Sequence, residues 1–251
     1  MLTRLADNLH RVQERIRAAA RRAGRDPAEV TLVAVTKTHP VDTLLAAYEL
    51  GVRHFGENRV EEALEKIPAV QSAIKNQQSE VTWHMIGHIQ SRKAEQVANL
   101  FDWAHSVDSL KLAERLNRFA AQQGKQLTVL LEFNVSGEAS KYGMRAPGDS
   151  ELLKTIEAIG ALPQLRLAGL MTLAPLGAAP ESARPIFRAL RELRDQLAGR
   201  FPQAEWRQLS MGMTDDFEVA IEEGATLVRV GRAIFGERRQ SPNPSSPTSN
   251  L

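Results

Sequence analysis

Apolar residues fall in short runs that alternate with longer segments of helical periodicity along most of the chain. Eight runs are rich in β-branched residues and have the length of buried strands. The predicted strands are Val30–Thr36, Arg53–Phe55, Thr82–Ile86, Trp103–Ser106, Thr128–Asn134, Arg166–Met171, Trp206–Ser210 and Leu227–Val230. The predicted helices between and after them are Val41–Leu50, Arg59–Ile67, Ser91–Ala98, Ser109–Gln123, Asp149–Ile159, Glu181–Ala198 and Asp215–Glu223. Strands and helices are therefore expected to alternate through the chain.

The spacing of the predicted strands decides between two α/β architectures. From Val30 to Arg238 the chain has 209 residues, so each of eight strand–helix units has about 26. That is the size of a unit in a (β/α)8 barrel, whereas a doubly wound sheet seldom needs eight evenly spaced parallel strands. We predict an α/β protein built on a single TIM-type barrel.

Two terminal segments lie outside the repeating pattern. Met1–Arg25 has apolar residues at helical spacing among acidic and basic side chains, and it lacks the continuous apolar core of a secretory signal. We expect an extra N-terminal helix there. Gln240–Leu251 is polar and rich in proline, which predicts a disordered tail after a barrel domain of residues 1–239.

The composition excludes several classes of protein. The chain of 251 residues has no cysteine, so disulfides, thiolate nucleophiles and cysteine-ligated metals are absent. Its 32 basic and 30 acidic residues leave a net charge of +2, which gives no reason to expect a nucleic-acid partner. The longest apolar runs are far shorter than the roughly 20 residues of a membrane span. We expect a cytoplasmic protein, a monomer, that binds neither nucleic acid nor a membrane.

In a barrel of this type the chemistry belongs to residues at the carboxyl ends of the strands. Lys37 follows the first apolar run directly, so its amine would be partly desolvated at the barrel mouth. Desolvation lowers the pKa of an amine and favours the neutral nucleophile that forms a Schiff base. The alternative is an ordinary strand-end lysine that extends into water.

The last two strands end in small residues that favour a phosphate site. Ser210 ends the seventh predicted strand, Gly212 follows it and Gly231 follows the eighth, where barrels often bind phosphate through backbone N–H groups. A lysine near such a site suggests a phosphorylated carbonyl compound, either pyridoxal 5′-phosphate or a sugar phosphate. Arg229 shares a strand face with Gly231 and could meet a pyridine nitrogen, although a strand-end salt bridge is nearly as good an explanation.

Other polar residues have simpler explanations. His84 and His88 have the spacing of paired metal ligands, but they lie on a strand and its loop, where that spacing does not bring side chains together. We expect no metal site. Asp215 and Asp216 stand where a helix begins, a position that capping and the helix dipole favour for acidic residues, so we interpret both as structural.

Several segments resemble a known family over Thr31 to Arg238. They are VAVTKTHP, HFGENRVEEALEK, WHMIGHIQSRK, NVSGEASKYGM, LAGLMTLAP and LSMGMTDDFEVAIEEGATLVRVGRAIFGER, in that order. Together they resemble the pyridoxal phosphate homeostasis protein family, whose single domain is similar to the amino-terminal barrel of alanine racemases.

The resemblance implies a cofactor site for pyridoxal 5′-phosphate. Lys37 would carry the cofactor as an internal aldimine, Asn58 would lie near the ring and Arg229 would meet the pyridine nitrogen. The residues expected around the phosphate are Ser210, Gly212, Gly231 and Arg232. Met211 and His84 would form the pocket wall or lie behind it. From their place on the loop after the fifth strand, Lys141 and Tyr142 could also reach the cofactor, although a solvated loop explains them equally well.

The chain departs from the family at one position. The family often has Thr or Ser after the glycine of the eighth strand, and this chain has Arg232. A hydroxyl donor is therefore missing, so either the backbone N–H alone binds the phosphate there or the guanidinium replaces the hydroxyl.

Three functions are compatible with these residues. The first is a protein of vitamin B6 homeostasis that holds pyridoxal phosphate without substantial catalysis and supplies it to dependent apoenzymes. The second is an amino acid racemase-type enzyme on the same barrel, although a racemase of this fold adds a second domain with a catalytic tyrosine. The third is an aldolase in which Lys37 acts directly on a sugar phosphate. We favour the first.

Overall fold

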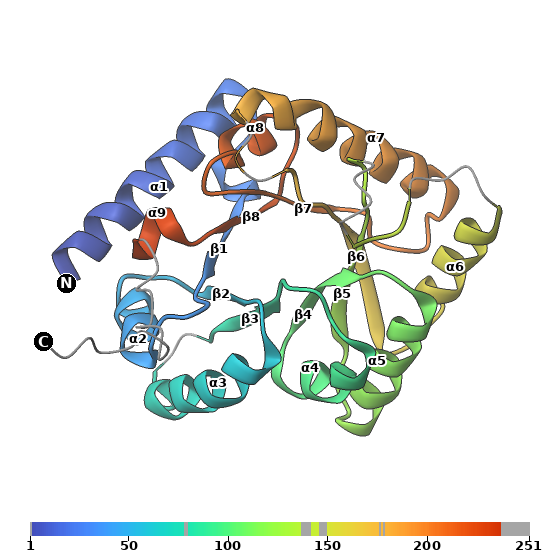
Figure 1. Ribbon diagram of the computed structural model, residues 1–251, viewed down its shortest axis with the longest axis horizontal. Helices are drawn as coiled ribbons and strands as arrows, with labels where there is room; N and C mark the ends of the chain where they lie inside the picture. Colours follow the sequence, from blue (N-terminus) through green and yellow to red (C-terminus); the bar gives the residue numbers. More distant parts are fainter. Residues whose placement is uncertain are drawn as a thin grey trace, which may run out of the picture.

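The eight strands of the protein form one closed parallel barrel. The computed structural model describes residues 2–77, 80–136, 142–145, 150–175, 177 and 179–236. The strands are β1 (Thr31–Val35), β2 (His54–Glu57), β3 (Thr82–Met85), β4 (Trp103–Val107), β5 (Leu127–Glu132), β6 (Leu165–Met171), β7 (Gln208–Met213) and β8 (Leu227–Val230). They follow one another in chain order, and pairing of β8 with β1 closes the barrel (Figure 1). The predicted TIM-type fold is confirmed.

Helices surround the strands (Figure 1). Within the described residues they are α1 (Leu2–Arg22), α2 (Val41–Glu49), α3 (Val60–Ile74), α4 (Ala94–Leu100), α5 (Leu110–Gln122), α6 (Ser150–Gly160), α7 (Arg184–Arg200), α8 (Phe217–Glu222) and α9 (Arg232–Phe235). Short 3-10 turns precede β1, α4 and α7. No helix in the described part of the chain is both long and apolar enough to cross a membrane.

The predicted N-terminal helix is α1, and it supports the last elements of the barrel. Leu5, Leu9, Val12 and Ile16 form its buried face. The helix packs beside α8 and α9 (Figure 1), and the Asn8 side-chain amide donates to the Ile234 carbonyl at 2.9 Å. α1 therefore fixes the segment that follows β8.

Hydrophobic packing is concentrated between the strands and the helices. The large core cluster occupies that layer, whereas a small separate cluster lies inside the barrel and consists of Val33, Leu130, Ala168, Met171 and Leu227. Other inward-facing positions hold buried polar residues, among them His84, His105, Ser210 and Arg229. The inside of the barrel is thus unusually polar for a fold whose centre is normally filled by branched apolar side chains.

Some boundaries differ from those predicted. β2 begins one residue later than expected and continues to Glu57. β7 runs to Met213, and its register with β8 shifts between Ser210 and Met213. α3 continues past Pro68, since its buried face extends to Val70 on the far side of the proline. The predicted tail at residues 240–251 lies outside the described residues.

Candidate functional site

Lys37 lies at the carboxyl end of β1, as the sequence indicated. Val33 faces the barrel interior, alternation along the strand puts Val35 on the same side, and Lys37 follows two residues after the strand ends. Lys37 is half-buried, in a turn where the next residue, Thr38, has a left-handed φ of 66°. The chain therefore turns sharply away from the rim immediately after this lysine.

A buried ion-pair cluster holds the backbone on both sides of that lysine. Lys66 Nζ donates to the Thr36 carbonyl at 2.9 Å, to Glu57 Oε1 at 3.0 Å and to Glu62 Oε2 at 2.9 Å. The Thr38 N–H donates to the same Glu62 oxygen at 2.7 Å. Burial raises the pKa of Glu57, and the Lys66 charge partly offsets this. Sequence reasoning missed the cluster, although a Glu and a Lys four residues apart on a helix were visible in GENRVEEALEK.

Three acceptor oxygens near the rim are buried without a donor. They are Glu57 Oε2, Asn58 Oδ1 and Glu132 Oε2, none of which has a hydrogen-bond partner within the described residues. The end of β3 also approaches this region closely, because a Cβ on Gly87 would lie 2.2 Å from the Asn58 carbonyl oxygen. A buried unpaired acceptor is costly, so the rim fits a ligand that brings donors or bridging water.

Arg229 points into the barrel and is 3% exposed. Its guanidinium donates to Ser210 Oγ at 2.5 Å and to the Thr172 carbonyl at 2.9 Å. Burial lowers its pKa to about 10, against the through-space attraction of Asp216 and Glu132. Arg229 forms no ion pair with another described residue. Its partners there are Ser210 and Thr172, in place of the strand-end salt bridge considered from the sequence.

Of the two predicted phosphate glycines, Gly212 lies in β7 and Gly231 directly follows β8, and their surroundings differ. Gly212 has a φ of 90°, and a Cβ there would lie 2.6 Å from Ala220 Cβ and 2.8 Å from Phe217 Cα. The close approach of α8 alone therefore requires a glycine. Gly231 precedes α9, and its Cβ would lie 3.2 Å from the Val35 carbonyl oxygen, so its side faces β1.

Arg232 forms an ion pair with Asp215 at 2.5 Å, and the two side chains are 54% and 62% exposed. The pair connects the β8–α9 junction with the β7–α8 turn. Asp216 Oδ1 accepts the Met213 N–H at 2.6 Å and makes no capping bond to α8. Asp216 thus occupies the N-cap position of α8 without a side-chain capping bond, and both aspartates have the structural role expected of them, through contacts across the turn.

Sequence reasoning also missed two buried polar residues. Glu132 ends β5 and is 4% exposed, and burial together with Asp108 raises its pKa to about 7 despite the opposing Arg229 charge. His105 in β4 contacts Ser210 and His84. The available signal was a polar residue at an inward position of an apolar strand. Lys141 lies outside the described residues.

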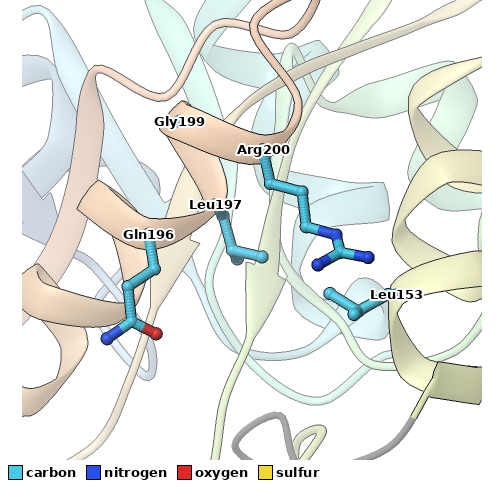
Figure 2. Close-up of a pocket in the computed structure, with 5 residues that line it drawn as sticks. All are labelled: Leu153, Gln196, Leu197, Gly199 and Arg200. Carbon is cyan, nitrogen blue, oxygen red and sulfur yellow. The ribbon is translucent and has the colours of Figure 1, made fainter.

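A pocket also occurs in the outer helical layer, away from the strand ends. It is lined by Leu153 of α6 and by Gln196, Leu197, Gly199 and Arg200 of α7. Figure 2 shows the Arg200 guanidinium extending toward Leu153. No residue from the carboxyl end of a strand lines this pocket.

Comparison with known proteins places the barrel in a defined class. The family described as alanine racemase, N-terminal domain, matches residues 8–239. An alanine racemase of Clostridium difficile has the same fold at a TM-score of 0.68, with 13% identity, and covers 98% of this chain and 59% of that one. The likeness to the racemase concerns the fold alone.

More similar relatives define the family within that class. The pyridoxal phosphate homeostasis protein of Pseudomonas aeruginosa is 45% identical over 237 residues, which are 94% of this chain and 97% of that protein. The one from Vibrio alginolyticus is 40% identical over 96% of this chain and its own full length. The PipY structure from Synechococcus elongatus with PLP bound has a TM-score of 0.77 and 35% identity, covering 92% of this chain and all of that one. The chain belongs to the pyridoxal phosphate homeostasis protein family.

Proposed function

We propose that the chain binds pyridoxal 5′-phosphate at the carboxyl ends of β1, β7 and β8 and holds it on Lys37 without substantial catalysis. The observation that carries this proposal is the buried Arg229 guanidinium, which donates to neutral oxygens one strand away from the lysine-bearing end of β1. The names of the curated relatives and the PLP-bound PipY structure support the same ligand.

The bound cofactor would supply an aldehyde that condenses with a lysine amine, a pyridine nitrogen and a phosphate. Lys37 would provide the amine, and Asn58 would bind near the ring through a side-chain oxygen that now has no donor. Arg229 would donate to the pyridine nitrogen with N–H groups not used by its present partners. The phosphate would be bound around Ser210, Gly212, Gly231 and Arg232.

Two features of these residues argue for binding without turnover. Racemisation needs an acid and a base on opposite faces of the cofactor, and Lys37 serves one face. Arg229 remains a cation and a donor, so it would keep the ring nitrogen unprotonated and the ring a poorer sink for carbanion charge. Storage and delivery of the cofactor to dependent apoenzymes, by a cytoplasmic monomer, is the role that we propose.

One observation favours the racemase-type alternative. Glu132 is a buried carboxyl near Arg229 with a pKa of about 7, which suits a general acid or base. The assay must therefore include Glu132→Gln. If the chain is an enzyme that uses this carboxyl, single-enantiomer alanine will racemise at about 1 per second or faster, and Glu132→Gln will abolish it.

Borohydride reduction of the loaded protein, followed by peptide mapping, tests the binding role. We expect the pyridoxyl group on Lys37 and loss of the visible absorption band in Lys37→Ala. The matched control is Lys93→Ala, which removes a partly exposed lysine that pairs with Glu61 and should leave the band intact. Labelling mainly at Lys66 or Lys141 would refute the assignment, and a colourless protein without bound vitamer would favour the aldolase.

A further inference from the structure

Three histidines form a continuous hydrogen-bonded string across the inside of the barrel. His54 Nδ1 lies 3.0 Å from His84 Nε2, and His84 Nδ1 lies 2.9 Å from His105 Nε2. His105 Nδ1 lies 2.8 Å from Ser210 Oγ, which also accepts from Arg229. The histidines come from consecutive strands β2, β3 and β4, but Ser210 belongs to β7, so the last step crosses the barrel.

Burial lowers the pKa of all three rings of the string. His84 and His105 are fully buried, and burial lowers the pKa of each well below its ordinary value. His54 is half-buried at the start of β2, where burial lowers its pKa and nearby Asp102 opposes the shift. The planes of His54 and His84 are tilted by 48°, and those of His84 and His105 lie at 86°. The three rings are therefore joined through single ring nitrogens, as a hydrogen-bond chain.

Arg229 fixes the direction of every bond in this chain. A guanidinium has no acceptor, so the Ser210 oxygen accepts from it and the Ser210 hydroxyl hydrogen needs an acceptor of its own. Within the described residues the other partner of that hydroxyl is His105 Nδ1. His105 then carries its single hydrogen on Nε2 and donates to His84 Nδ1, and His84 in turn donates from Nε2 to His54 Nδ1.

We propose that His84 and His105 are positioning residues for Arg229. Each is held in the Nε2–H tautomer, and together they keep the Ser210 hydroxyl turned away from the guanidinium so that its oxygen accepts from Arg229. The opposite direction would leave two donors facing Ser210 and its own hydrogen unpaired in a buried site, which costs free energy. Relevance to the cofactor rests on the proposed function, because that function places Arg229 against the pyridine ring. The tautomers do not depend on it.

Nitrogen NMR of the ligand-free, 15N-histidine-labelled protein tests the tautomers directly. Two-bond correlations distinguish Nε2–H, Nδ1–H and doubly protonated rings. We expect His84 and His105 to remain neutral Nε2–H rings between about pH 5 and 8. Assignment uses Ser210→Ala, which should change the His105 signals most, and His10→Gln, which removes an exposed histidine of α1 outside the string. An Nδ1–H or charged ring at either buried position would overturn the proposal.

Two variants of His105 test the positioning role. His105→Leu removes the acceptor for Ser210, so we expect cofactor affinity to fall about tenfold and the absorption band of the bound cofactor to become pH-dependent. His105→Asn retains a carbonyl oxygen near the Nδ1 position and should recover most of both properties. Unchanged affinity and pH profile in a folded His105→Leu would refute the role. If that variant does not fold, His105→Asn is compared with wild type in both assays. Loss of the His84 Nε2–H signal together with a fall in affinity supports the role, and loss of that signal with unchanged affinity refutes it.

Failure of this proposal and failure of the proposed function give different results. If wild-type protein does not bind pyridoxal phosphate but shows the expected tautomers, the function is wrong and the hydrogen-bond direction stands. If it binds on Lys37 but the buried rings carry hydrogen on Nδ1, the function stands and the positioning role is wrong.

Discussion

Replacing Glu132 by Gln should stabilise the protein in a pH-dependent way. The carboxyl ends β5 almost completely buried, and its Oε2 atom has no hydrogen-bond partner within the described residues. Burial raises its pKa from 4.5 to about 7, Asp108 adds to the shift, and Arg229 partly offsets it. The glutamine amide keeps the shape of the side chain and cannot ionise.

The sign follows from proton binding by the folded and unfolded states. Between pH 4.5 and about pH 7, Glu132 keeps its proton in the folded chain and has released it in the unfolded chain. The free energy of unfolding therefore falls as the pH rises through this interval. This decrease in the free energy of unfolding is complete above about pH 7 and amounts to at most about 3 kcal/mol. Glu132→Gln should therefore gain up to about 3 kcal/mol at pH 8 and little at pH 4.5.

Urea unfolding of wild type and Glu132→Gln across about pH 4.5 to 8 measures the difference. Glu157→Gln is the matched control, since Glu157 is exposed on α6 and its variant should follow the wild type at every pH. A stability difference between Glu132→Gln and wild type that is the same at both ends of the range would refute the reasoning, because no titration of Glu132 would then separate the folded and unfolded states.

Three further predictions concern the rim and the tail. Lys66→Met should destabilise by about 3 kcal/mol at pH 7 because it leaves Glu57 buried and charged, and Glu57→Gln in the same chain should recover much of that loss in a thermal melt. Arg232→Ala should raise the Kd for pyridoxal phosphate about tenfold, and Asp215→Ala should lower the Kd because it frees the Arg232 guanidinium. Unchanged Kd values in binding titrations would mean that Arg232 stays paired with Asp215. Deletion of Gln240–Leu251 should leave Tm and cofactor occupancy unaltered, and a clear loss of either would contradict the tail prediction.

The barrel could be predicted because its signal is local. Each strand is a short β-branched run, and the spacing of the runs indicates how many strand–helix units the chain contains. Lys37 stood out because it ends the most apolar of the early runs, and strand alternation indicated that Arg229 points inward. These inferences need only the few residues around each position.

The partners of these residues could not be predicted because they come from other elements of the fold. Lys66 reaches the backbone beside Lys37 from a helix thirty positions along the chain, and His105 contacts Ser210 across 105 positions. Gly212 suited a phosphate contact, but its φ of 90° and the closeness of Phe217 and Ala220 to its Cβ position depend on how α8 packs on β7. All three features depend on the packing of elements against one another.

The polar interior explains why the barrel depends on its outer layer for stability. Three histidines, a serine and an arginine occupy inward positions, so few apolar side chains remain inside and the large core lies between strands and helices. Such a network contributes little net free energy unless every member is paired, and an unpaired member is costly. Each link of the string satisfies the next, from His54 to Arg229. The barrel therefore gives up apolar packing at its centre and gains an arginine whose direction is fixed before any ligand arrives.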